Sequence, residues 1–138
     1  MSSDYEANLP FARHIHKGRL STAIKREHEA VRGEIEKTGT GRRWWAYQGR
    51  DVRPFVAYTR FQDRRLTIAV IAGDRAHTGR MTKICQALEH YAYSQELTLK
   101  FEAVFNKGLE DFLRARGYRS ADPNVFTSPD LIFDPRNP

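Results

Sequence analysis

The stretch Leu66-Thr-Ile-Ala-Val-Ile-Ala72 and the loop Gly73-Asp-Arg-Ala-His-Thr-Gly79 that follows it decide the fold predicted for this chain of 138 residues. The first seven residues are apolar except for one threonine, which is typical of a strand buried on both faces inside a sheet. After the polar loop, apolar residues recur at helical spacing. They are Met81, Ile84, Cys85, Leu88 and Ala92. The stretch therefore predicts a central strand, a polar loop and an amphipathic helix.

The sequence before this stretch predicts a helix and two more strands. Apolar residues recur at helical spacing between residues 20 and 37, and Gly39 follows as a left-handed stop. The period then changes to two, so residues 43–47 and 52–61 are predicted strands joined to their neighbours by short polar turns. Three consecutive strands with short turns predict an antiparallel meander.

The sequence after the helix predicts a further strand, a helix and a strand-rich tail. Residues 97–104 alternate in polarity, Asn106 is placed as a helix N-cap, and Gly117 closes that helix. Residues 125–133 offer one or two short strands. The fold class is therefore α/β (α+β): a mixed, mostly antiparallel central sheet flanked by helices.

Length and composition indicate one folded unit. We expect an irregular N-terminal segment at 1–18 and a single domain at 19–138, because 138 residues suit one core. A lone Cys85 excludes a disulfide framework within the chain. No apolar run approaches the roughly 20 residues that span a bilayer, and residues 1–6 lack the features of a secretory signal. We therefore expect a soluble, cytoplasmic protein without a membrane partner.

Positive charge is concentrated in the first half of the chain. Residues 1–65 hold 14 Lys and Arg against 8 Asp and Glu, whereas residues 66–138 hold nine of each sign. Arginine binds phosphate and carboxylate bidentately, so this half predicts an anionic partner such as a nucleic acid or an acidic protein. Charged side chains also protect sheet edges from aggregation, and a solvated edge is the alternative. The candidate acceptor or anion-binding residues are Arg42, Arg43, Trp44, Arg50, Arg53 and Arg60.

Two adjacent tryptophans add an aromatic element to this basic region. Trp44 and Trp45 point to opposite faces of a strand, so at most one belongs to the core. The other either stacks on a base or ligand or packs against the N-terminal helix.

The loop before the second helix suits phosphate. The start of a helix presents free backbone N–H groups and the positive end of the helix dipole. Arg75 and Arg80 add positive charge there, and Thr78 adds a hydroxyl. Glycine and threonine also cap ordinary turns, so a purely structural loop is the alternative.

The second half resembles, without gaps, the core of the GNAT (GCN5-related N-acetyltransferase) superfamily. That pattern has a strand ending in Val, a loop Arg/Gln-x-x-Gly-x-Gly/Ala, a helix with paired apolar residues and Ala, a strand, Asn, a helix and Gly-Phe. Here Ile71 takes the Val position, Gly79 the first loop glycine, Asn106 the asparagine and Gly117-Tyr118 the Gly-Phe. The resemblance covers about residues 20–133.

The resemblance implies binding of acetyl-CoA or another acyl-CoA. The pyrophosphate would lie on the amides of loop 76–81, the thioester carbonyl would meet a backbone N–H near residues 70–71, and the pantetheine would enter the splay between strands 66–72 and 97–104. The implied cofactor-binding residues are Val70, Ile71, Arg75, Ala76, His77, Thr78, Gly79, Arg80, Met81 and Asn106.

The implied reaction is direct attack of an amine on the thioester. The amine would belong to a protein, a nucleic acid or a small molecule. The candidate proton carriers are Tyr58, His77, Glu102 and Tyr118.

Three positions depart from the family pattern. Ala76 replaces the loop Arg/Gln, Met81 replaces a small residue, and Leu113 stands at the position of a frequent tyrosine acid. These departures favour the alternative of a degenerate GNAT fold that binds nucleic acid or protein without catalysis.

We expect no metal site. His14 and His16 share one face of an extended segment, but no carboxylate or cysteine stands at suitable spacing to complete a ligand set. Cys85 lies on an apolar stripe, which predicts a buried small hydrophobe rather than a nucleophile.

Overall fold

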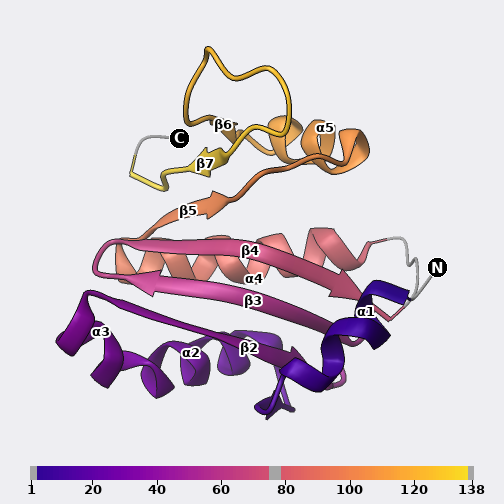
Figure 1. The fold of residues 1–138 in the computed structure, drawn as a ribbon, viewed down its shortest axis with the longest axis vertical. Coiled ribbons are helices and arrows are strands. Elements are labelled where there is room, and N and C mark those ends of the chain that lie inside the picture. The colour runs from indigo at the N-terminus through magenta and orange to yellow at the C-terminus, as the bar shows by residue number, and fades with distance from the viewer. Residues whose placement is uncertain (1–2, 75–78, 137–138) are drawn as a thin grey trace.

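The computed structural model describes residues 3–74 and 79–136 and contains one seven-stranded mixed sheet flanked by helices (Figure 1). The helical elements are α1 (Ser3–Asn8), the 3-10 turn η1 (Leu9–Phe11), α2 (Leu20–Ala30), α3 (Arg32–Thr38), α4 (Arg80–Gln95) and α5 (Lys107–Ala115). The strands are β1 (Ile15–His16), β2 (Thr40–Tyr47), β3 (Phe55–Gln62), β4 (Arg65–Gly73), β5 (Thr98–Phe101), β6 (Arg119–Ser120) and β7 (Leu131–Phe133).

The strand order is β1-β2-β3-β4-β5-β7-β6. Only the β1–β2 and β4–β5 pairs are parallel, so the prediction of a mostly antiparallel sheet is confirmed. The predicted meander is β2-β3-β4, and β4 lies in the middle of the sheet as its apolar sequence indicated. The architecture is compatible with a GNAT-like fold.

The two faces of the sheet are covered unequally. Helices α2 and α4 contact each other and enclose the main core, which includes Ile24, Trp45 and Ile84. The opposite face carries a smaller cluster in which Tyr5 of α1 packs over Ala46 and Val56. In Figure 1, α1 covers only one end of that face. The turn η1 packs beside α1 through Leu9, and no other described helix covers that face (Figure 1).

A β-bulge in β4 separates this strand from β5. Tyr58 pairs with Val70 but the next residue, Thr59, pairs with Ile68, so Ala69 is the extra residue. Pairing between β4 and β5 ends at Ile68 and Phe101, and Figure 1 shows β5 turning away from β4 beyond this point. The bulge and the end of pairing open a gap between two neighbouring strands.

The N-terminal segment 1–18 is more ordered than predicted. Instead of an irregular segment it contains α1, η1 and β1, and β1 adds a parallel strand to the edge of the sheet. These elements are two to six residues long, too short for periodicity to reveal, and contacts with the sheet stabilise them.

The helix predicted over residues 20–37 is two helices. Val31 ends α2 and begins α3 with φ −100° and ψ 4°. A Cβ on Gly41 would lie 2.6 Å from Val31 Cβ, so the absence of a side chain at Gly41 lets this corner pack directly on β2.

The predicted helix ends are confirmed. Asn106 Oδ1 accepts a hydrogen bond from the Leu109 amide at 2.9 Å, which caps α5. Gly39 and Gly117 have φ of +84° and +99°, the left-handed conformation expected of helix-terminating glycines. The predicted strand 97–104 is shorter, because Ala103 has φ +49° and turns the chain.

Candidate functional site

The gap between β4 and β5 is a cleft of about 620 Å³. This volume falls in the range of roughly 300–1,000 Å³ that small-molecule sites occupy. Most of its lining is apolar, and its polar side chains are those of Asp4, Arg80, Glu102 and Asn106. The sequence resemblance predicted a splay between these two strands, and the cleft lies there.

Backbone amides form one wall of the cleft. Along a strand paired on one side, N–H and C=O groups alternate between the two edges. Asp74 donates its amide to the Pro54 carbonyl at 3.2 Å on the β3 side. The amides of Ile71 and Gly73 therefore point to the other edge, and both residues line the cleft. By the same alternation the amide of Val70, predicted with Ile71, points toward β3, and Val70 does not line the cleft.

Arg80 begins α4 at one end of the cleft. Its side chain is 7% exposed, and Arg80 Nη2 lies 2.7 Å from Asp74 Oδ1. Asp74 also contacts Arg53 Nη2 at 3.3 Å, so two guanidinium groups share one carboxylate. A Cβ on Gly73 would lie 1.1 Å from Arg80 Nη1, so only glycine accommodates this arrangement.

This end of the cleft holds positive charge and unsatisfied donors. Among the described residues, the Nε atoms of Arg53 and Arg80 are buried without a hydrogen-bond partner. Gly79 precedes α4 with φ +89°, and no side chain of the described residues caps the helix. Free amides at the start of a helix and a surplus of guanidinium groups favour an anion.

Part of the predicted phosphate loop lies outside the described residues. Arg75, Ala76, His77 and Thr78 belong to this part, so their predicted roles stay predictions. Met81, also predicted, lines the cleft with Arg80.

Charged side chains surround the opposite end of the cleft. Arg60 binds Glu102 with both terminal nitrogens, and Glu102 lines the cleft. Asp130 accepts a hydrogen bond from the Ala103 amide at 2.7 Å and pairs with Lys100 at 3.2 Å. Burial raises the pKa of Asp130, but these hydrogen bonds outweigh burial and lower the pKa overall. The Asp130 bond holds Ala103 in its strained conformation at the rim.

Two of the other candidate proton carriers, Tyr118 and Tyr58, lie outside the cleft. Tyr118 is buried and donates its hydroxyl to Glu89 at 3.0 Å. Burial is the largest cause that raises the pKa of Tyr118 far above its usual value. Tyr58 lies on the open sheet face against Trp44, with ring centroids 5.2 Å apart. Of the four candidates, the described structure brings only Glu102 to the cleft.

The arginines predicted as one anion-binding surface are dispersed. Arg43 faces α2, where it binds Glu27, and Arg53 belongs to the Asp74 group. Arg42 and Arg60 are direct neighbours on the opposite face of the sheet. Arg50 is exposed in the loop between β2 and β3. Alternation along β2 separates Arg42 from Arg43, so proximity in sequence did not produce one cluster.

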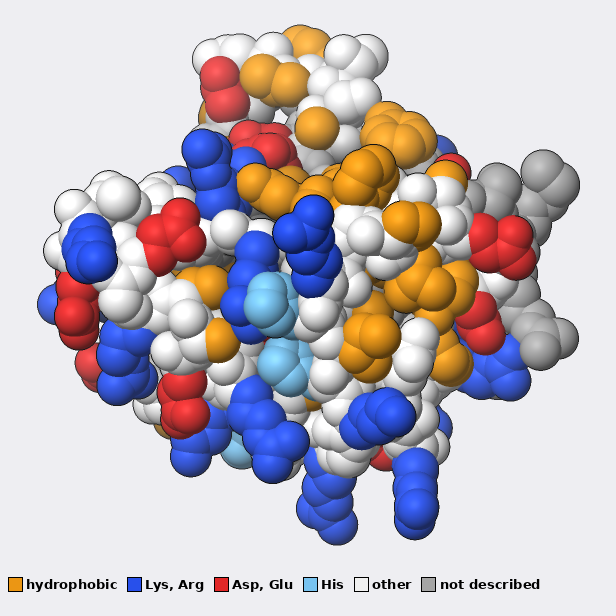
Figure 2. All heavy atoms as spheres, turned by 60° about the horizontal axis from the view of Figure 1, so that its bottom comes forward, with side chains coloured by type: hydrophobic (Ala, Val, Ile, Leu, Met, Phe, Trp, Pro, Cys, Tyr) orange, Lys and Arg blue, Asp and Glu red, His pale blue; other side chains and the backbone are white. Residues whose placement is uncertain are grey.

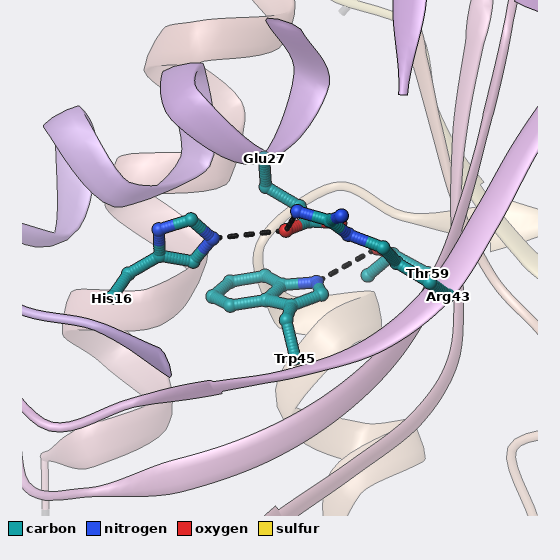
Figure 3. A network of polar contacts seen from close by, with 5 residues as sticks. All are labelled: His16, Glu27, Arg43, Trp45 and Thr59. Atoms are coloured by element: carbon teal, nitrogen blue, oxygen red, sulfur yellow. Dashed lines mark hydrogen bonds and ion pairs between the residues drawn. The ribbon is translucent and has the colours of Figure 1, made fainter. Parts of the chain in front are cut away.

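A buried polar network beneath α2 was not predicted (Figure 3). Glu27 is 1% exposed, and its carboxylate accepts hydrogen bonds from His16 Nε2 at 2.9 Å and Arg43 Nε at 2.8 Å. Beside it, the Trp45 indole donates to Thr59 Oγ1 at 2.8 Å. Glu27 lies on the same helix stripe as Ile24 and Val31. In the sequence, a charged residue on an apolar stripe of the helix was the one sign of this buried network.

Cys85 is part of the main core. Cys85 is fully buried, and burial raises the pKa of its thiol to about 12. Over the described ranges, no group of three or more His, Cys, Asp or Glu side chains is placed to hold a metal ion. None of the helices described is long and apolar enough to cross a membrane.

Comparison with known proteins finds a distant structural likeness. No protein-family model matches the chain, and no curated protein matches its sequence. The chain is similar to the crystal structure of anti-CRISPR protein AcrVA5, with 12% identity and a TM-score of 0.48. The match covers 58% of this chain and 90% of that chain. At this identity and TM-score the likeness does not bear on activity.

Proposed function

We propose that the protein is an acyl-CoA-dependent N-acyltransferase. The observation that carries the proposal is the cleft that opens where β4 bulges at Ala69 and parts from β5, beside the start of α4. An extended thioester arm fits a gap between strands, and a pyrophosphate fits the start of a helix.

The residues present fit an acyl-CoA. The amides of Ile71 and Gly73 offer hydrogen-bond donors along the arm, and Asn106 lines the same cleft. The buried, unsatisfied Nε of Arg80 marks a place where an anionic group would complete the hydrogen bonding. Asp74 neutralises only one of the two guanidinium groups that it contacts.

When bound, the acyl thioester supplies an activated acyl group. The Ile71 amide donates a hydrogen bond to the carbonyl oxygen and stabilises the negative charge that develops as the amine attacks. Glu102, at the rim, accepts the proton that the attacking nitrogen loses. Transfer of the acyl group to nitrogen would break the carbon–sulfur bond, and CoA would leave as a thiolate with the electron pair of that bond.

A second candidate function is binding without catalysis. Leu113 is fully buried where the family often has a tyrosine acid, and Met81 lines the cleft where a small residue is usual. Both observations favour a fold that has lost its cofactor.

Acetyl-CoA is expected to raise the melting temperature of the protein. A ligand that binds only the folded state stabilises it by about 2.7 kcal/mol at one hundred times its Kd. Gly79→Glu should remove this shift, because it places a carboxylate at the start of α4. Gly39→Glu is the matched control, since Gly39 also has a left-handed φ and open space around its Cα but lies between α3 and β2. Thermal melting and calorimetric titration measure both effects.

Failure of millimolar acetyl-CoA to stabilise the wild-type protein would overturn the acyltransferase proposal. Equal loss of binding in Gly79→Glu and Gly39→Glu would also contradict it, because the effect would then not come from the start of α4.

A further inference from the structure

The sheet face opposite α2 and α4 carries a row of basic residues. Register places Arg42 opposite Arg60, Arg60 opposite Thr67, and Thr67 opposite Lys100. The row continues through Ile132 to Arg119. Directly opposed residues share a face, so all of these side chains project on the same side. At about 4.8 Å per strand, the row spans roughly 24 Å.

A row of aromatic rings runs beside the basic row. Trp44 lies two residues after Arg42, and Tyr58 lies two residues before Arg60. Both rings are therefore on the same face as the arginines, about 6.7 Å from them along the strands. Phe11 of η1 extends the row, with its ring centroid 5.6 Å from that of Trp44. Phe11 is 60% exposed. Figure 2, turned toward the β2 side, shows hydrophobic side chains beside Lys and Arg on the surface.

The charge of this face is positive after its ion pairs are counted. A fifth cation, Arg65, lies two residues from Thr67 on the same face. Arg60 is paired with Glu102, and Lys100 with Asp130. Arg42, Arg65 and Arg119 are exposed. Five basic side chains therefore meet two carboxylates in the row, α1 adds Asp4 and Glu6 at one end of the face, and the three exposed arginines remain directed at solvent.

We propose that this face binds single-stranded nucleic acid, with bases on the aromatic row and phosphates along the basic row. A nucleotide carries its phosphate and its base on different sides of the sugar, so adjacent rows of cations and rings match both parts. Aromatic platforms within basic grooves bind single strands in this manner. The bases of a duplex are stacked inside it and cannot reach the aromatic row. An acidic peptide would pair with the arginines but has no bases to stack on the rings. This surface adjoins the cleft where Arg60 pairs with Glu102, but the residues of the two rows do not line the cleft, so the inference does not depend on acyl-CoA binding.

Fluorescence anisotropy with a labelled single-stranded oligonucleotide of about 12 nucleotides tests the inference. We expect binding that weakens steeply between about 50 and 200 mM salt. Arg42→Glu should weaken binding and lower the slope of log K against log salt by about one. Arg26→Glu is the control with the same charge change, since Arg26 is exposed on α2 across the sheet.

The aromatic row is tested with Phe11→Ala, which should weaken binding on the order of 5- to 100-fold. Phe126→Ala is its control, because Phe126 is 87% exposed but lies in the loop between β6 and β7. Melting curves establish that each variant is folded. Four results would overturn the inference: no binding at low salt, equal affinity for duplex, equal affinity for oligoglutamate, or equal effects of each variant and its control. Tighter binding of oligoglutamate would assign the face to an acidic protein.

Discussion

Replacing Glu27 by alanine is expected to lower the free energy of unfolding by about 3–5 kcal/mol, the usual cost of breaking a buried ion pair. The substitution leaves Arg43 and His16 without the carboxylate that they share beneath α2. Urea unfolding measures the loss. Glu29→Ala is the control, because Glu29 is exposed on the same helix and should change stability by less than about 0.5 kcal/mol.

The same network predicts a dependence of stability on pH. Burial on its own would raise the pKa of Glu27, but the hydrogen bonds from His16 and Arg43 outweigh burial and lower the pKa below its usual value of 4.5. A carboxyl group with a lowered pKa in the folded state contributes fully above pH 4.5 and loses this contribution as the pH falls through the lowered pKa. The stability difference between wild type and Glu27→Gln should therefore shrink in acid. A Glu27→Ala variant as stable as wild type, or a difference that grows in acid, would contradict the role given to Glu27.

Replacing Gly108 by tryptophan is expected to weaken acetyl-CoA binding by at least about 100-fold, since an indole would occupy space that the ligand needs. Gly108 is the second residue of α5 and lines the cleft. A Cβ there would lie 3.3 Å from Asn106 Oδ1 and meet no other atom within 4 Å, so a side chain requires Asn106 to shift by a few tenths of an ångström.

Gly33→Trp provides a closely matched control. Gly33 is the second residue of α3, and a Cβ there has no neighbour within 4 Å. Calorimetric titration of both variants should show wild-type affinity for Gly33→Trp and little binding for Gly108→Trp. Wild-type affinity in Gly108→Trp would mean that acetyl-CoA binds elsewhere.

Much of the fold could be predicted because local patterns and tertiary packing agree. The apolar run in β4 indicated a central strand, and Asn106 and Gly117 marked the limits of α5 by their capping chemistry. The division of the long N-terminal helix at Val31 could not be predicted from periodicity. Its cause is the packing of that corner on Gly41. Gly41 lies outside the helical segment, so the periodicity of that segment carries no sign of the contact.

The candidate site was predicted less completely than the fold. The resemblance indicated the region between β4 and β5. The position of the bulge could not be predicted, because its extra residue, Ala69, is an apolar residue within an apolar strand. The pairing of Arg53 with Asp74 depends on two loops that meet only in the folded chain. Period-two alternation, by contrast, could have placed Arg42 and Arg43 on opposite faces of β2 from the sequence alone. The prediction of one arginine cluster rested on the number of arginines in the segment and did not consider the face on which each lies.

Backbone amide NMR during a titration with acetyl-CoA tests the central claim that the cleft binds acyl-CoA. The predicted result is saturable chemical-shift change at Ile71, Gly73, Gly79 and Met81 and on the facing rim at Ala103 and Asn106. Amides of β1 and β6, remote from the cleft, should change little. No change at millimolar acetyl-CoA, or changes confined to residues outside the cleft, would contradict the account.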